Sequence, residues 1–172
     1  AATSVMRAAS AVPALPPAEV PIVEPQAALL PATALSGSPE AVAAPYTDYT
    51  VSQGPHGFSY GHAAIDLTAG NGATILSPIN GNVTQNFVDY LGNTTLVIEN
   101  DIYQVTLMHG NYYVAVGDTL SIGQMIGAES NNGNTVDWWG RSCQGRDCGY
   151  HTHWNMFDKR TGSNVNPLTL IP

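Results

Sequence analysis

The chain has few charged residues and no long apolar run. Only 10% of its 172 residues are Asp, Glu, Lys or Arg, against roughly a quarter in an average protein. The five basic residues leave a net charge of −8. A surface with this excess of negative charge repels phosphate groups, which argues against nucleic acid as a partner. Because no run of 18 apolar residues occurs, we expect no transmembrane segment.

Cysteine is also scarce, with only Cys143 and Cys148 in the chain. Two thiolates without a neighbouring Cys or His pair make a weak zinc motif, so a disulfide closing a short polar loop is favoured over zinc binding. A disulfide indicates an oxidising, exported environment. The first residue is Ala1 and no signal-like apolar segment is present, which also fits a secreted chain from which a leader has been removed.

Residues 1–46 differ in composition from the rest of the chain. They hold eight of the twelve prolines, fourteen alanines and one glycine, so a long helix or a central strand is excluded. This composition predicts an extended Ala/Pro-rich arm or linker before a domain at residues 47–172.

The arm has three possible roles. The simplest is a spacer. Burial of its apolar residues instead favours packing on another copy or another protein, as in a homo-oligomer or larger assembly. A pro-segment lying across the chain's own groove is the less favoured role. The apolar residues concerned are Val20, Ile22, Val23, Leu29 and Leu30.

Short runs of β-branched and aromatic residues separated by turn residues fill the chain from Thr47 onward, with no amphipathic helix of useful length. Asn100-Asp101 between two of these runs predicts a hairpin. The spacing predicts an all-β domain, an antiparallel sheet with a sandwich-like or barrel arrangement. The predicted strands are Ala73–Leu76, Asn82–Val88, Thr94–Glu99, Ile102–Met108, Tyr112–Val116, Gly123–Glu129 and His151–Asp158.

Histidines occupy patterned positions in two of the predicted segments. In the last strand, the period of two places His151, His153 and Asn155 on one face. Earlier in the chain, His62 and Asp66 are four residues apart, a spacing that suits a turn feeding a strand. Two histidines, one carboxylate and an open position form a recognised catalytic zinc site, although each pattern alone is weak.

Two further histidines remain. His109 closes the strand Ile102–Met108 just before a turn, at a sheet rim where active sites gather. His56, between a proline and a glycine, is interpreted as a loop residue.

Together these motifs make residues 54–171 resemble the lysostaphin-type, or LytM-like, zinc endopeptidases, which cut peptidoglycan. The resemblance extends beyond the histidines, through connecting motifs that occur in the family's order. They are Gly72–Pro78 with Gly81-Asn82-Val83, Val116-Gly117-Asp118, Gly123–Gly127 and Val165-Asn166-Pro167.

The resemblance implies a fold, a metal and a chemistry. It implies a groove over an antiparallel sheet and Zn²⁺ held by His62, Asp66 and His153. It also implies that His109 and His151 flank the open position, where they orient or deprotonate the attacking water. The implied substrate is a peptidoglycan peptide, and the implied location is secreted or in the cell envelope.

The chain departs from the family pattern in several places. Ala64 stands where a glycine is usual, Tyr60 where an arginine is common, and Asn155 where the family has a glutamate. The stretch 131–150 is longer than typical and borders the implied groove. No catalytic tyrosine can be assigned, since Tyr60 and Tyr150 are both candidates.

Two functions follow from these patterns. The first is a zinc metalloendopeptidase that hydrolyses peptidoglycan cross-links. The second is a catalytically weak or inactive module of the same fold that serves binding or assembly in an extracellular complex.

Overall fold

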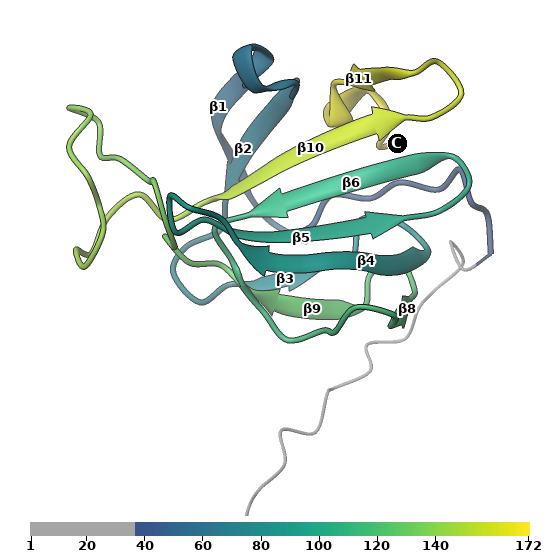
Figure 1. Cartoon of the computed structure of the whole chain (residues 1–172), viewed down its shortest axis with the longest axis horizontal. Coiled ribbons are helices and arrows are strands. Elements are labelled where there is room, and N and C mark those ends of the chain that lie inside the picture. The colour runs from purple at the N-terminus through teal and green to yellow at the C-terminus, as the bar shows by residue number, and fades with distance from the viewer. Residues whose placement is uncertain (1–36) are drawn as a thin grey trace, which may run out of the picture.

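A computed structural model describes residues 37–172, which form eleven β-strands, two 3₁₀ helices and no α-helix (Figure 1). The all-β prediction is therefore confirmed. Within these residues no helix has the length and apolarity needed to cross a membrane. The elements are β1 (Thr50–His56), η1 (Phe58–Tyr60), β2 (Ala64–Thr68), β3 (Thr74–Leu76), β4 (Gly81–Val88), β5 (Thr94–Glu99), β6 (Tyr103–Met108), β7 (Asn111–Tyr112), β8 (Thr119–Leu120), β9 (Met125–Ala128), β10 (Thr152–Asp158), β11 (Ser163–Val165) and η2 (Pro167–Thr169).

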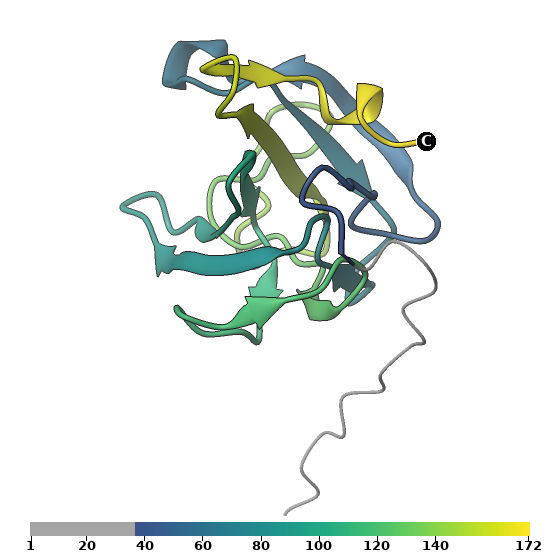
Figure 2. The same cartoon turned by 90° about the vertical axis from the view of Figure 1, so that its right-hand side faces the viewer.

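The strands form two antiparallel sheets. The large sheet has the order β1-β2-β10-β6-β5-β4-β8, with β11 paired to β10, and the small sheet has the order β3-β9-β7. Both views place the small sheet on one side of the large one (Figures 1 and 2). The hydrophobic core lies between them, because Ile75 and Ile126 of the small sheet join Leu96, Leu107 and Trp154 of the large sheet in one buried cluster.

Several predicted strands lie where the sequence placed them. β5 has the predicted bounds, while the predicted strand Tyr112–Val116 shortens to the two-residue β7. Three strands were not predicted: β1, β8 and β11. The strand that the spacing of His62 and Asp66 suggested is β2. The sequence of β1 contains Gly54 and Pro55, which resemble a turn, but a proline is tolerated here because β1 is an edge strand.

The end of the predicted arm packs on the domain. Val42 and Tyr46 are each 4% exposed and belong to the core cluster. The Tyr46 hydroxyl hydrogen-bonds to the Thr152 hydroxyl of β10, and the Pro45 carbonyl accepts a hydrogen bond from the Leu76 N–H. The proposed anchors of the arm lie outside the described residues: Val20, Ile22, Val23, Leu29 and Leu30.

Candidate metal centre

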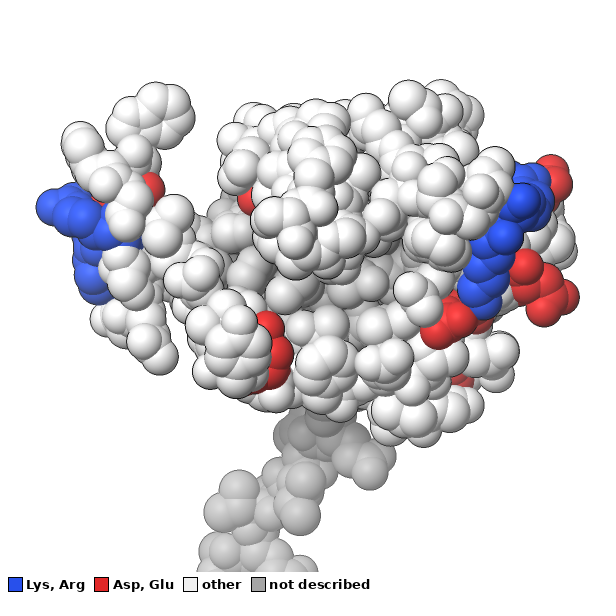
Figure 3. All heavy atoms as spheres, turned by 45° about the horizontal axis from the view of Figure 1, so that its top comes forward, with Lys and Arg blue, Asp and Glu red and all other residues white. Residues whose placement is uncertain are grey.

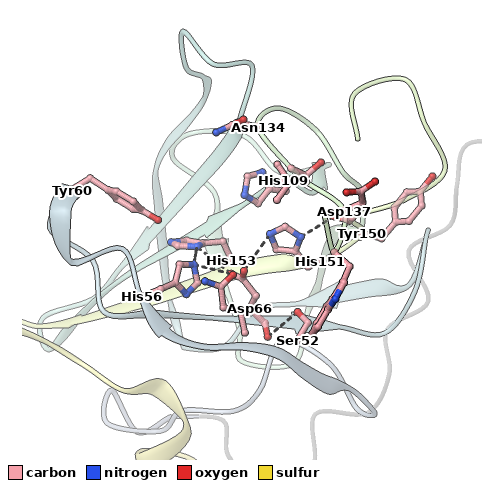
Figure 4. Close-up of a pocket in the computed structure, with 15 residues that line it drawn as sticks. Ser52, His56, Tyr60, Asp66, His109, Asn134, Asp137, Tyr150, His151 and His153 are labelled. Atoms are coloured by element: carbon pink, nitrogen blue, oxygen red, sulfur yellow. Dashed lines mark hydrogen bonds and ion pairs between the residues drawn. The ribbon is translucent and has the colours of Figure 1, made fainter. Parts of the chain in front are cut away.

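A cavity of about 520 Å³ opens where β1, β2 and β10 meet segment 134–138 (Figure 4). Four histidines and two carboxylates line it, and none of its lining residues is a lysine or an arginine. In the space-filling view, the basic side chains lie at the two ends of the molecule, away from the middle of this face (Figure 3). The cavity therefore combines metal-binding side chains with a lining that contains no basic side chain.

Asp66 and His153 form the centre of this site. They are paired in the register of β2 and β10, and the Asp66 Oδ1 lies 3.2 Å from the His153 Nδ1. Both residues are buried, at 5% and 3% exposure. The predicted alternation of β10 is observed, since Trp154 and Met156 lie in the core cluster while His153 and Asn155 serve the site. Strand pairing alone thus brings two candidate ligands together.

His56 joins this pair, and its interpretation as a loop residue is wrong. It is the last residue of β1, and its Nε2 lies 3.1 Å from the His153 Nδ1 and 3.4 Å from the Asp66 Oδ1. The three ligand atoms lie within 4.8 Å of one another, which makes this group a candidate cation site. The sequence offered no regular spacing for His56, because its contact with Asp66 depends on the pairing of β1 with β2.

His62 reaches the same cluster from the turn before β2. Its Nδ1 lies 3.0 Å from the His153 Nε2, the ring nitrogen that does not face Asp66. Gly57 permits this approach: its φ is 85°, and a Cβ there would lie 2.9 Å from the Cβ of His62. A side chain at position 57 would therefore push His62 away from the site.

His109 and His151 lie together at the cavity, with ring centroids 4.7 Å apart. The His109 Nδ1–H donates to the Asn132 carbonyl at 2.8 Å, and the His151 Nδ1–H donates to the Gly149 carbonyl at 2.8 Å. Because a carbonyl can only accept, both rings carry their proton on Nδ1 when neutral and keep the Nε2 lone pair free. Both are therefore prepared to accept a proton.

The backbone at His109 explains how its side chain reaches the site. Alternation along β6 would place His109 on the core side with Val105 and Leu107, which are fully buried. Instead, His109 has a φ of 73°, the only positive φ of a non-glycine residue within 37–172. This left-handed conformation ends the alternation and turns the imidazole toward His151.

The protonation states of these groups follow from burial and neighbouring charges. Burial, followed by the nearby His151, lowers the pKa of His109 to about 4. Burial, followed by His153 and His56, lowers the pKa of His62 to about 4. Burial opposes ionisation of Asp66, but the adjacent His153, His151 and His56 imidazoles hold its pKa below the usual value. At neutral pH the site therefore presents the Asp66 carboxylate together with the neutral imidazoles of His62 and His109.

The donor set fits a divalent metal such as zinc. The Asp66 Oδ1 is buried and makes no hydrogen bond within the described residues. A buried carboxylate oxygen without a donor is costly unless a cation satisfies it. Imidazole nitrogens together with a carboxylate oxygen are the ligands of catalytic zinc sites.

The long loop 131–150 forms one wall of the cavity. The Cys143–Cys148 disulfide is present, as predicted. Asp137 accepts hydrogen bonds from Arg141 at 2.8 Å and Arg146 at 3.1 Å, so both basic side chains are paired. On this fixed loop Trp138 is 94% exposed and lines the cavity. Tyr60 and Tyr150 also line it, but neither makes a hydrogen bond to the site histidines.

The sequence and the fold were compared with known protein families and solved structures. Residues 60–167 match Peptidase family M23. The fold is similar to that of a putative M23 peptidase from Pseudomonas aeruginosa, with 20% identity over 78% of this chain and 52% of that chain and a TM-score of 0.56. It is also similar to a zinc-containing peptidase from Vibrio cholerae, with 21% identity over 74% and 39% of the two chains and a TM-score of 0.56.

A third similar structure is the antimicrobial peptidase lysostaphin from Staphylococcus simulans, with 17% identity over 78% of this chain and 54% of that chain and a TM-score of 0.54. The chain thus spans about half or less of the length of these three proteins. At these identities the likeness concerns the fold. Curated protein sequences yielded no match.

Proposed function

Because the chain belongs to peptidase family M23, we propose that it is a zinc-dependent endopeptidase that hydrolyses peptide cross-links in bacterial peptidoglycan. One observation carries the proposal: Asp66 and His153 meet a third histidine in a cavity that also holds His109 and His151. A metal-binding group and a pair of proton acceptors are the two components that hydrolysis by an activated water requires.

Asp66 and His153 are the ligands common to every arrangement that the geometry permits. The sequence motif proposes His62 as the third ligand, and His56 is the other histidine within reach. When bound, zinc supplies a Lewis acid that polarises the scissile carbonyl and lowers the pKa of a water molecule.

His109 and His151 carry the proton transfers in this proposal. Their Nδ1–H groups are fixed on backbone carbonyls, so each Nε2 can accept a proton from the attacking water and later donate it to the leaving amine. The lowered pKa keeps His109 neutral near pH 7, the form in which it can accept a proton. The fixed loop 131–150 would limit which peptides enter.

The location proposed for this activity is outside the cytoplasm. The family's action on cell walls and the Cys143–Cys148 disulfide both favour a secreted or cell-envelope protein. The role of the arm in a larger assembly stays a prediction, because residues 1–36 lie outside the described part of the chain.

A second candidate function is a binding or assembly module that keeps the fold and the metal without efficient turnover. It is favoured by Asn155, which replaces a glutamate usual in the family and leaves the site with one carboxylate fewer.

Digestion of purified peptidoglycan distinguishes the two functions. The products are identified by mass spectrometry, with and without a chelator, and zinc content is measured in parallel. We expect new amino termini that appear only in the absence of chelator. Bound zinc without any released product would favour the module instead.

A further inference from the structure

We propose that the tip of loop 131–150 binds the glycan strand of peptidoglycan through Trp138 and Trp139, while the attached peptide occupies the metal-site cavity. This inference rests on the proposed function and deepens it, because it gives the enzyme a contact with the sugar part of its substrate. The ligand is a neutral polysaccharide, and its binding surface is the pair of indole rings.

The two tryptophans are adjacent and leave most of their surface in water. Trp138 is 94% exposed and Trp139 is 76% exposed, whereas the third tryptophan of the chain, Trp154, is fully buried. A single exposed apolar residue is common, but neighbouring large apolar side chains on a surface mark an interaction site. The loop that carries them stands away from both sheets, so neither sheet covers the rings (Figure 1).

A small hairpin presents both rings in an ordered conformation. Val136 and Ser142 form a β-bridge across it. The Asp137 carboxylate accepts hydrogen bonds from the backbone N–H groups of Trp139 and Arg141, both at 3.0 Å. The disulfide of the same loop closes the segment that follows. Because the tip is ordered before a ligand arrives, binding there costs less conformational entropy.

Arg141 prepares Trp139 for one flat ligand. Its guanidinium carbon lies over the Trp139 ring, 4.9 Å from the centroid, which is a cation–π contact. This contact occupies one face of the indole and leaves the other face to a ligand. Within the described residues the Arg141 side chain donates only its Nε–H, to Asp137 at 2.8 Å, so its terminal NH₂ groups are available to an acceptor on that ligand.

A sugar ring matches this combination of an aromatic face and hydrogen-bond donors. A pyranose has C–H groups on its faces and hydroxyl or acetamido groups around its edge. The C–H groups carry partial positive charge and are attracted by the negative face of an indole ring. The oxygen atoms at the edge can accept hydrogen bonds from a guanidinium group.

The charge of the loop favours a neutral ligand over an anionic surface. The loop contains two acidic and two basic residues, Asp137, Asp147, Arg141 and Arg146, so its formal charge is zero in a chain of net charge −8. An anionic membrane attracts basic segments and repels an acidic protein. A glycan strand whose carboxyl groups are joined to peptides by amide bonds has no such repulsion to overcome.

Trp138 connects this surface to the metal site. It lines the cavity that contains Asp66 and His109, whereas Trp139 lies outside that lining. Each peptide of peptidoglycan is joined to a glycan strand, so a substrate whose peptide is in the cavity has sugars close to it. The two tryptophans therefore extend the substrate-binding surface from the cavity to the strand.

Titration of the intact chain with chitohexaose, a neutral hexasaccharide of N-acetylglucosamine, tests this surface in the presence of zinc. The probe contains no peptide bond, so the enzyme cannot hydrolyse it as a peptidase. We expect saturable binding by calorimetry and a blue shift of tryptophan emission, since Trp138 and Trp139 leave water while Trp154 is already buried. Trp138→Ala and Trp139→Ala should each weaken binding by about tenfold or more, as truncation of a central interface tryptophan does.

Three further variants serve as controls, and far-UV circular dichroism establishes that each is folded. Trp139→Phe retains an aromatic face and should keep most of the affinity. Trp139→Leu is apolar but has no ring, so it should lose about as much affinity as Trp139→Ala. Tyr113→Ala removes an aromatic ring that is 65% exposed and does not line the cavity, and it should bind as the wild type does.

The outcomes separate this inference from the proposed function. Absence of saturable binding by the wild type, or full affinity in both alanine variants, would overturn the glycan surface. So would a chain that ignores chitohexaose but uses these tryptophans to bind phosphatidylglycerol vesicles or to dimerise in light scattering. Release of peptidoglycan peptides without chitohexaose binding would refute this inference alone. Tryptophan-dependent chitohexaose binding without any released peptide would refute only the proposed hydrolysis.

Discussion

Asn155 accepts a 2.9 Å hydrogen bond from the backbone N–H of Ala63 and so links β10 to the segment that carries His62. The NH₂ of the same side chain donates to Asn164 Oδ1 at 2.9 Å, and Asn164 donates in turn to the Gly61 carbonyl at 2.6 Å. A carboxylate at position 155 could accept from Ala63 but could not donate to Asn164. The replacement of the family's glutamate is thus matched to a local amide network.

This network predicts that Asn155→Ala destabilises the protein by about 1–3 kcal/mol, because the part-buried Ala63 N–H loses its acceptor. Zinc affinity should fall as the His62 segment loosens. Urea denaturation and zinc titration measure the two effects. Asn164→Ala, which breaks the next link, should act in the same direction. An Asn155→Glu variant more active than the wild type would show that a carboxylate is needed instead.

His109→Asn and His151→Ala should retain zinc and lose activity. Removal of a positioned acid–base group lowers the rate by about 10²–10⁴-fold. Asparagine is the suitable replacement at position 109 because it tolerates the positive φ there. Turnover of peptidoglycan fragments and zinc content are measured on the same samples. Stoichiometric loss of zinc in either variant would mean that the residue is a ligand.

The stability of the metal-free protein should depend on pH. His109 has a pKa of about 4 in the folded protein and about 6.5 when unfolded. Above pH 6.5 the His109 imidazole is neutral in both the folded and the unfolded state, so its titration does not lower the stability of the fold there. As the pH falls from 6.5 to about 4, the unfolded state gains the proton first and stability decreases by up to about 1.4 kcal/mol per pH unit.

Urea denaturation at pH 7 and pH 5, in the presence of a chelator, measures this effect. His62 should contribute in the same direction but less strongly, because it is partly exposed to solvent. His109→Asn should show a smaller loss between the two pH values. An identical loss in wild type and variant would contradict the assignment of the low pKa to His109.

Opening of the disulfide should affect substrate recognition more than folding. A double Cys143→Ser, Cys148→Ser variant loses a short-loop disulfide that stabilises by about 2 kcal/mol in the chain-entropy description. The loop that carries Trp138 lies outside the core cluster, so we expect KM to rise while the unfolding temperature falls by only about 5–10 °C. Trp138→Ala should raise KM without changing kcat. An unchanged KM in both variants would show that the loop does not contribute to substrate binding.

Deletion of residues 1–36 tests the role of the arm. This truncation keeps Val42 and Tyr46, which belong to the core cluster. If the arm packs on another copy, light scattering will show a larger mass for the full chain than for the truncated one. Monomers of equal stability in both cases would leave the arm as a spacer.

The sequence predicted the site best where the spacing of residues within one segment is enough to place their side chains. The two-residue period of β10 placed His153 and Asn155 on one face, as observed, and the four-residue spacing pointed to Asp66, which lies beside His153. His56 was missed because β1 is an exposed edge strand whose Gly54 and Pro55 resemble a turn. Its proximity to Asp66 depends on non-local pairing and an irregular register, which composition does not reveal.

His109 shows the opposite case, in which the residue was found but its geometry was not. Its position at the end of β6 was correctly recognised as the rim of the sheet. Strand alternation alone would have directed it toward Val105 and Leu107, and only the left-handed backbone brings it beside His151. No pattern of neighbouring residues predicts a positive φ at a histidine.

The same backbone conformation determines which residues position 109 accepts under different selections. Glycine and asparagine suit a φ of 73° better than histidine does, so a library selected only for folding should drift toward them at this position. A library selected for cell-wall lysis should retain histidine despite its conformational cost. Deep sequencing of the two pools would therefore reveal selection for catalysis at His109 before any substrate bond is known.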